Sequence, residues 1–363
     1  MNDIKRRMNG VEAQVRQLLG DINLPYKPFR KELYTVKELM HGYSPRNPNG
    51  SRDSIIARHY KHQGGQAPRR TLDAMAQRIH DNSIDRALIR FVLNRRHRRR
   101  RKIVGIMGGH SASRKDSNYV KVARIARELT ANSYCIVSGG GPGIMEAANL
   151  GAYMAAFPRG ELQNALEILA KFPDYGKTRN SRANYIKAAK QVLERYPHGR
   201  ESLAIPTWGY SDEPISQFPS AIGKYFANSI REDGLVGIGI FGLIFAPGSS
   251  GTMQEIFQDA AQNSYWSFHL RSPMVLLDSS FYRANPSIYD VLLSRANKDG
   301  YADLVSLQDD PDEVVKFIIA HQPQRRHRRR PKSLHTSPWV QLNLGTVSLL
   351  RSRTNTGLRR TGA

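Results

Sequence analysis

Glu255 is the residue of this 363-residue chain best placed to do chemistry beside a bound phosphate. Residues 247–252 (PGSSGT) follow the apolar stretch 243–246 and precede a helical pattern that contains Glu255. A strand, a tight turn and a helix N-terminus gather unpaired backbone N–H groups and the positive end of the helix dipole, which favours an anion. A carboxylate one turn further on could stabilise the positive charge that develops on a ribose during N-glycosidic cleavage.

Two more glycine-rich loops follow predicted strands. Residues 108–113 follow the strand expected at 103–107, and residues 139–143 follow the strand expected at 134–137. Because ligands bind beyond the carboxyl ends of parallel strands, we expect all three loops to converge on a nucleotide or a sugar phosphate. The predicted phosphate-binding residues are Gly108, Ser111, Gly139, Gly140, Gly141, Gly143, Gly248, Ser249, Ser250, Gly251 and Thr252.

A dinucleotide-binding fold is the main alternative for these glycines. Its GxGxxG pattern would need a third glycine where this chain has Glu146, and no acidic residue ends the strand expected at 202–205. No P-loop GK[ST] is present either. We therefore expect no NAD, no metal and no organic cofactor, and Glu146 is expected to complement the helix dipole. His110 could bind phosphate or protonate the base, or it could be an ordinary loop residue.

The order of elements predicts the fold class. Strands and helices alternate through residues 103–320, which indicates an α/β, Rossmann-like, doubly wound parallel sheet with helices on both faces. The strands are expected at 103–107, 134–137, 202–205, 243–246 and 274–277. Helices are expected around 122–129, at 144–155, at about 215–236, near 286–297 and at 311–320.

Three further segments flank or interrupt this domain. Residues 1–102 are predicted to form a basic, partly helical extension, which ends in two helices separated by a break at 81–83. Residues 158–201 are predicted to be a helical insertion that caps the site, builds an oligomer contact or simply extends the structure. Residues 321–363 lack periodicity and are expected to be disordered.

The net charge of +24 lies in the flanks. Residues 1–102 hold 24 Lys and Arg against 9 Asp and Glu, and residues 321–363 hold 10 against none, whereas residues 103–320 hold 21 against 22. The arginine-rich run at 94–102 could contact nucleic acid, or it could be a solvated helix end whose cations complement the helix dipole. No aromatic residues interleave with these arginines, which favours the second interpretation.

Cysteine content and hydropathy predict the compartment. The single cysteine, Cys135, lies in an apolar run typical of a buried strand and has no intrachain disulfide partner. No apolar run approaches the roughly 18–20 residues that a membrane-spanning helix needs, and the N-terminus has no signal-peptide pattern. We expect a cytoplasmic protein that does not associate with membranes.

Residues 247–255 (PGSSGTMQE) resemble the PGGxGTxxE signature of the LONELY GUY (LOG) family, with Ser249 in place of the second glycine. Residues 139–145 are similar to the glycine loop of that family, and Arg231 matches an arginine on the helix before the signature. The resemblance covers roughly residues 103–320, and the extension and insertion resemble larger members similar to nucleotide 5′-monophosphate nucleosidases. It implies that Glu255 and Arg231 are catalytic, and Arg231 could anchor the phosphate or polarise the departing base.

The leading hypothesis is therefore a hydrolase that cleaves the N-glycosidic bond of nucleoside 5′-monophosphates such as AMP to a free base and ribose 5-phosphate. We expect a homo-oligomer, at least a dimer. Two alternatives stay open: a non-catalytic nucleotide sensor on the same fold, and a protein that binds nucleic acid through its basic flanks.

Overall fold

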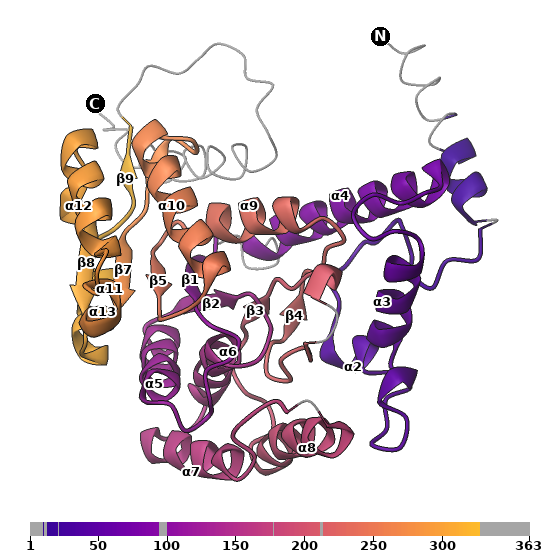
Figure 1. The fold of residues 1–363 in the computed structure, drawn as a ribbon, viewed down its shortest axis with the longest axis horizontal. Coiled ribbons are helices and arrows are strands. Elements are labelled where there is room, and N and C mark those ends of the chain that lie inside the picture. Colours follow the sequence, from indigo (N-terminus) through magenta and orange to yellow (C-terminus); the bar gives the residue numbers. More distant parts are fainter. Residues whose placement is uncertain are drawn as a thin grey trace, which may run out of the picture.

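A seven-stranded parallel sheet forms the centre of the computed structural model, which describes residues 10, 13–20, 22–93, 100–176, 178–210 and 213–326 (Figure 1). The strands are β1 (Lys102–Met107), β2 (Tyr134–Ser138), β3 (Leu203–Ala204), β4 (Ala221–Ile222), β5 (Leu243–Phe245), β7 (Met274–Leu277) and β8 (Val305–Gln308). Their order is β4-β3-β2-β1-β5-β7-β8, and every neighbouring pair is parallel. The predicted Rossmann-like fold class is confirmed.

The strand order reverses next to β1. The chain moves outward through β2, β3 and β4, and then returns to place β5 on the other side of β1. In an open parallel sheet such a reversal opens a crevice beyond the strand ends, where ligands bind. The loops after β1 and β5 are therefore the ones expected to form the site.

Helices cover both faces of the sheet, because side chains alternate along each strand. Ile103 and Met107 of β1 belong to one buried apolar cluster, whereas Val104 and Ile106 belong to another on the opposite face. The first cluster includes α4 (Thr71–Leu93), α9 (Asn228–Ile238), α10 (Ser250–Tyr265) and α12 (Ile288–Asp299). The second includes α5 (Ser117–Ala131), α6 (Ile144–Met154), α7 (Arg159–Ala170), α8 (Arg179–Arg195) and α13 (Pro311–Ala320).

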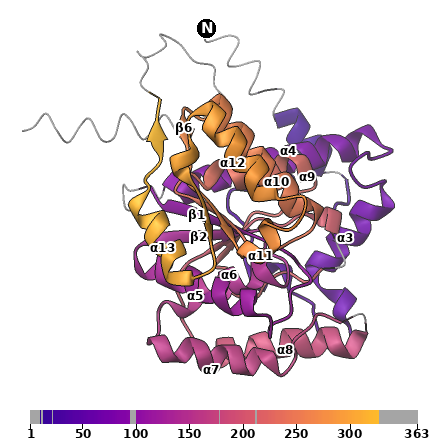
Figure 2. The same cartoon turned by 60° about the vertical axis from the view of Figure 1, so that its left-hand side comes forward.

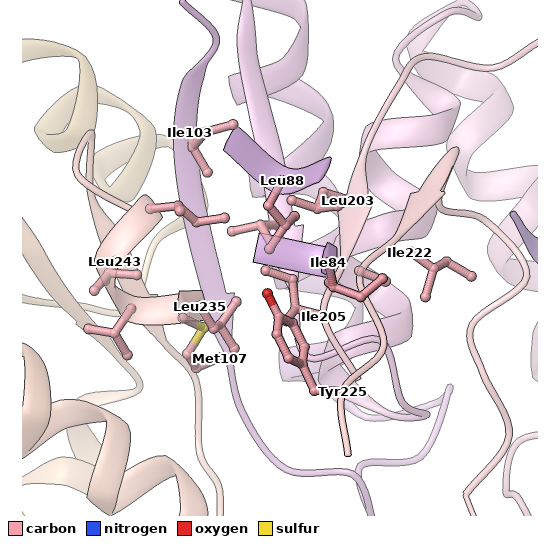
Figure 3. Packing of buried hydrophobic residues seen from close by; sticks show 14 of the residues in the cluster. Ile84, Leu88, Ile103, Met107, Leu203, Ile205, Ile222, Tyr225, Leu235 and Leu243 are labelled. Carbon is pink, nitrogen blue, oxygen red and sulfur yellow. The ribbon is translucent and has the colours of Figure 1, made fainter. Parts of the chain in front are cut away.

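The N-terminal extension packs directly on the sheet. It contains α2 (Val36–Leu39), a 3-10 turn (Pro48–Gly50), α3 (Arg52–His62) and α4. Figure 3 shows Ile84 and Leu88 of α4 packed among strand residues such as Leu203. Tyr34 also forms an antiparallel bridge with Ile222 of the edge strand β4, through N–H···O bonds of 2.9 and 2.8 Å. The extension and the sheet therefore share one core.

The predicted helix break at 81–83 is wrong, because α4 is continuous from Thr71 to Leu93. The polar side chains there make contacts outside the helix instead of ending it. The Asp81 carboxylate accepts from the backbone N–H groups of Phe226 (3.0 Å) and Ala227 (2.9 Å). The Ser83 hydroxyl accepts from the Arg30 N–H at 3.1 Å. Polar residues typical of turns here tie α4 to its neighbours.

The single helix expected at about 215–236 is also wrong. Its first part forms a loop and the short strand β4, and α9 begins only at Asn228. Pro219 and Gly223 flank β4, and both disfavour a helix interior. The edge strand β8, for which no expectation was made, completes the far side of the sheet.

The basic run at 94–99 and residues 327–363 lie outside the described residues, so the predicted disorder of the tail stays a prediction there. Just before them, β9 (Gln324–Arg325) pairs antiparallel with β6 (Leu270–Arg271), so ordered structure continues past the predicted boundary at 321. Cys135 is buried in β2, and burial raises the pKa of its thiol to about 12. No helix of the described part of the chain is long and apolar enough to cross a membrane.

The predicted insertion contains two helices, α7 and α8, which Figure 2 shows side by side below the sheet. A buried ion pair ties α8 to the domain. Arg114, in the loop after β1, donates to both carboxylate oxygens of Glu146 in α6, at 2.6 and 2.8 Å. The hydroxyl groups of Tyr119 (2.9 Å) and Tyr185 of α8 (2.7 Å) donate to the same carboxylate. Glu146 therefore holds the insertion in place, a role beyond the predicted complement to the helix dipole.

Candidate anion-binding site at the sheet switch point

The three glycine loops meet at the carboxyl edge of the sheet, as their positions after the strands predict. Gly109 is the residue that joins them. Its N–H donates to the Pro247 carbonyl at 2.9 Å, and its own carbonyl accepts from the Ile144 N–H at 3.1 Å. Gly143 has φ +65°, and a Cβ there would lie 2.5 Å from the Gly109 carbonyl oxygen. A glycine is therefore required at 143 for the loops to approach this closely.

A cavity of about 320 Å³ opens between these loops, and we call it the site cavity. Most of the predicted site residues line it: Gly108, Gly139, Gly140, Gly141, Arg231, Ser249, Ser250, Gly251, Thr252 and Glu255. Three predicted residues, Ser111, Gly143 and Gly248, do not. Gly143 and Gly248 shape the loops, while Ser111 is exposed. A volume of this size is suited to a small ligand.

The N-terminus of α10 faces the cavity without a side-chain cap. Ser249 is the N-cap residue, yet its side chain accepts no capping hydrogen bond. A Cβ added to Gly251, in the first turn, would meet nothing within 4 Å. The backbone N–H groups and the positive end of the dipole are therefore accessible to an anion.

The serine in place of a glycine at 249 fits the local backbone. Ser249 has φ −94° and ψ −159°, an extended conformation that any residue can adopt. At Gly248, in contrast, a side chain would collide with Thr252, and its Cβ would lie 3.0 Å from the Gly109 backbone nitrogen. Close packing of the loops depends on the first glycine of the motif and tolerates a side chain at the second position.

Arg231 and Glu255 lie side by side in the wall of the cavity. Arg231 Nη1 is 3.4 Å from Glu255 Oε1 and 3.9 Å from Glu232 Oε1. Arg231 Nε donates to the Ile205 carbonyl at 2.7 Å, which fixes the guanidinium. A side chain at Gly139 would collide with that guanidinium, so the glycine loop leaves room for Arg231. The structure thus brings together the two residues that the sequence singled out for chemistry.

Burial raises the pKa of Glu255 to about 7; Arg231 opposes this shift and Glu232 adds to it. The carboxyl group is therefore poised to change protonation near neutral pH, which suits acid–base chemistry. Burial also raises the pKa of Asp85 to about 7 and of Asp259 to about 8. Neither aspartate lines the site cavity. Glu255 therefore differs from these two aspartates by its location in the cavity and not by its raised pKa.

Lys224 is a cation of the site that sequence reasoning missed. Its side chain is almost fully buried, lines the cavity, and places Nζ 2.8 Å from Asp53 Oδ1 of α3. Asp53 also accepts from the Trp208 indole N–H at 2.9 Å. The N-terminal extension therefore positions a lysine at the site. The separation of 171 residues between Lys224 and Asp53 leaves no local pattern in the sequence.

Glu213 and His110 form a second acid–base pair at the rim of the cavity. His110 Nδ1 is 3.9 Å from Glu213 Oε1, and the imidazole is about half exposed. Burial raises the pKa of Glu213, while the neighbouring His110, Arg231 and Lys224 lower it. Within the described ranges, no group of three or more His, Cys, Asp or Glu side chains is arranged to hold a metal ion.

The fold and this site define a Rossmann-like protein with an uncapped helix N-terminus beside an Arg–Glu pair. Residues 101–156 match the family model described as the SLOG cluster4 family. That segment spans β1, α5, β2 and α6 and includes the first two glycine loops. The resemblance to LOG-type proteins is therefore confirmed in this part of the chain.

Solved structures with a similar arrangement include the molybdenum cofactor binding protein from Rippkaea orientalis, at 15% identity and a TM-score of 0.39. The match covers 61% of this chain and 97% of that protein. The Moco carrier protein from Chlamydomonas reinhardtii is similar at 16% identity and a TM-score of 0.36, over 61% of this chain and 99% of its own. No curated protein matches the chain.

Proposed function

We propose that the site cavity binds a nucleoside 5′-monophosphate and that the protein hydrolyses its N-glycosidic bond. The products would be a free base and ribose 5-phosphate. The observation that carries this proposal is the placement of the buried Arg231–Glu255 pair in the same cavity as the uncapped N-terminus of α10. An uncapped helix N-terminus and a titratable carboxylate are thereby combined within one small volume.

The phosphate belongs at the N-terminus of α10, where Gly251 leaves the backbone N–H groups open. Binding energy at this point would hold the sugar in place for reaction at C1′. The buried Lys224 adds a positive charge to the same cavity. A nucleoside that lacks the phosphate would lose these interactions.

The reaction breaks the bond between C1′ and the base nitrogen, and the bonding electrons leave with the base. Positive charge then develops on the ribose, and the ionised Glu255 would stabilise it or orient the attacking water. The water oxygen bonds to C1′ and gives up one proton, and the base takes up one proton, so that the step is balanced by water alone. Arg231 could stabilise the negative charge that develops on the departing base.

Incubation of the full-length protein with a panel of nucleoside 5′-monophosphates, assayed for released base, tests the proposal. Adenosine should react with kcat/KM at least about 100-fold below that of AMP, because the phosphate contacts are missing. Comparable efficiency on AMP and adenosine would contradict the assignment of the α10 N-terminus.

Substitutions at Gly251 provide a matched pair for the same site. Gly251→Asp places a negative charge where the phosphate is proposed to bind, while an aspartate in the first turn is compatible with the helix dipole. Gly251→Ala is the neutral control, since an added Cβ meets nothing within 4 Å. AMP binding by calorimetry should be lost in the first variant and largely kept in the second.

Binding without hydrolysis is the second candidate, and Ser249 is the residue that favours it. Ser249 lines the cavity at the position where the LOG signature has a glycine, so its side chain occupies space beside the ligand. AMP binding by calorimetry without release of base from any monophosphate would favour this nucleotide-binding role. Release of base that Ser249→Gly leaves unchanged would remove the reason for it.

A further inference from the structure

A second cavity, of about 440 Å³, lies between the N-terminal extension and the insertion. We call this cavity the basic cleft, because its lining includes four cationic side chains. They are Arg58 and Lys61 of α3 and Arg179 and Arg182 of α8. In Figures 1 and 2 the loop that precedes α3 reaches toward α8. Residues of both helices line this cavity. The site cavity and the basic cleft share the lining residues Glu213, Pro214 and Ile215, so the two are adjacent.

Backbone carbonyl groups hold the arginines of this cleft. Arg58 Nη2 donates to the Asn49 carbonyl at 2.8 Å, and Arg179 Nε donates to the Pro45 carbonyl at 3.1 Å. Arg182 Nε donates to the Gly176 carbonyl at 3.3 Å. A carbonyl orients a guanidinium without neutralising its charge, and each of these arginines keeps further N–H donors. Within the described chain, no carboxylate lies within 4.0 Å of any of the three guanidinium groups.

The two carboxylates in the lining do not offset this positive charge. Asp53 is paired with Lys224 at 2.8 Å and accepts from the Trp208 indole, so it serves the site cavity. Glu213 lies in the wall shared with the site cavity, where burial raises its pKa. The basic cleft therefore has an excess of positive charge over a concave surface. Arginine groups that converge on a cavity are suited to a phosphate, because the planar guanidinium can bind its oxygens in pairs.

We infer that the basic cleft is a second phosphate subsite, which binds an additional phosphate group of the same nucleotide ligand. The inference rests on the proposed function, since it takes the first phosphate to bind at the α10 N-terminus. A shared wall and the Asp53–Lys224 contact link the two cavities, which favours one extended ligand over two separate anions. The preferred ligand is then a nucleotide that carries a second, separated phosphate in addition to the 5′-phosphate of the proposed function.

Titration calorimetry with AMP, adenosine 3′,5′-bisphosphate and the dinucleotide pApA tests this inference on the full-length chain. The two larger probes differ in the reach of their second phosphate, and at least one should bind at least tenfold more tightly than AMP. The double variant Arg58→Gln/Arg182→Gln should reduce that gain to threefold or less while leaving AMP affinity within twofold. Arg124→Gln, an exposed arginine of α5 away from both cavities, is the matched control and should keep the gain.

Three outcomes would overturn the inference. Equal affinity of the unmodified protein for AMP and for both larger nucleotides excludes a second phosphate subsite that is used by the same ligand. A gain that survives the double variant places the subsite elsewhere. Pyrophosphate binding that depends on Arg58 and Arg182, without any gain for the extended nucleotides, makes the cleft a separate anion site.

Failure of the proposed hydrolysis would be visible separately, because calorimetry measures binding alone. Arginine-dependent binding of pApA without release of base from any nucleotide would leave the subsite intact and reject the chemistry. Circular dichroism melting curves of the double variant would exclude misfolding as a cause of lost binding.

Discussion

Two buried Arg–Glu pairs, each with its glutamate early in a helix that follows a glycine-rich loop, differ in how completely they are satisfied. The Glu146 carboxylate receives two hydrogen bonds from Arg114 and one each from Tyr119 and Tyr185. Among the described residues, the Glu255 carboxylate has one longer contact, of 3.4 Å, with Arg231. The first pair is enclosed by protein, whereas the second lines a cavity.

The difference teaches how the same residue types serve structure in one place and chemistry in another. Burial alone would lower the pKa of Arg114, but the paired Glu146 raises it above its ordinary value, so the guanidinium keeps its charge. At Glu255 burial outweighs the single arginine, and the pKa rises to about 7. Unused hydrogen-bonding capacity and an adjustable charge are what a reacting group needs.

Glu146→Gln is expected to have the largest effect, a loss of folding stability, because it leaves the Arg114 charge buried without its carboxylate. Breaking a buried ion pair in this way costs about 3–5 kcal/mol, a large share of the stability of an ordinary domain. Urea unfolding of the purified variant measures the loss. Should this variant not fold, the melting temperatures of Arg114→Met and of Arg114→Met/Glu146→Leu provide the comparison. The double variant should be the more stable, because no uncompensated charge is left, and the reverse order would contradict a structural ion pair.

Glu255→Gln should have the opposite profile, with a large effect on turnover and a small one on stability. Loss of a preorganised charge that stabilises a transition state costs about 10²–10³-fold in kcat, whereas the amide keeps the shape of the side chain. Base release from the best monophosphate measures turnover, and calorimetry checks that the ligand still binds. A variant that turns over at the unmodified rate would remove Glu255 from the mechanism.

The contrast between the pairs also shows where sequence reasoning ends. The strand–turn–helix pattern around residues 247–255 is local, so it predicted the convergence of the loops and the placement of Glu255. In sequence, Glu146 resembles Glu255, because both follow glycine-rich loops. What separates them are Tyr185 and Arg114, which approach Glu146 from 39 and 32 residues away. Such contacts form only when these distant segments pack together in the folded chain.

Other parts of the fold were missed for the same reason. Strand β4 has only two residues, too few for a periodic pattern, and its place depends on pairing with β3 and Tyr34. Lys224 could not be assigned to the site without Asp53 of the extension. Asp81 is typical of a turn in sequence but accepts two backbone N–H groups near the start of α9. In each case a contact between distant segments overrides local propensity.

The pH dependence of hydrolysis should reveal the adjustable charge of the Arg231–Glu255 pair as a rate change of about tenfold. If ionised Glu255 stabilises the transition state, kcat/KM should rise about tenfold between pH 6 and pH 8, through an apparent pKa near 7. The same group should make unfolding easier as pH rises from about 4.5 to 7, because the unfolded chain loses a proton that the folded protein keeps. The stability change between pH 5 and pH 8 should be smaller in Glu255→Gln. A rate that falls across this range would instead assign Glu255 as a general acid.

The smallest effect is expected from Tyr185→Phe, which removes one of the four hydrogen bonds to Glu146 and keeps the ring packed over Arg114 at 3.3 Å. A hydrogen bond to a charged group contributes about 1.5–3 kcal/mol, and the three remaining donors should limit the loss to the lower end of that range. Because Tyr185 belongs to α8, amide hydrogen exchange should accelerate in α8 more than in β1 or β5. Turnover on monophosphates should be unchanged, since the hydroxyl group does not reach the site cavity. A loss of activity without loss of stability would show that the Glu146 cluster acts on the site, and the separation between a structural pair and a chemical pair would no longer hold.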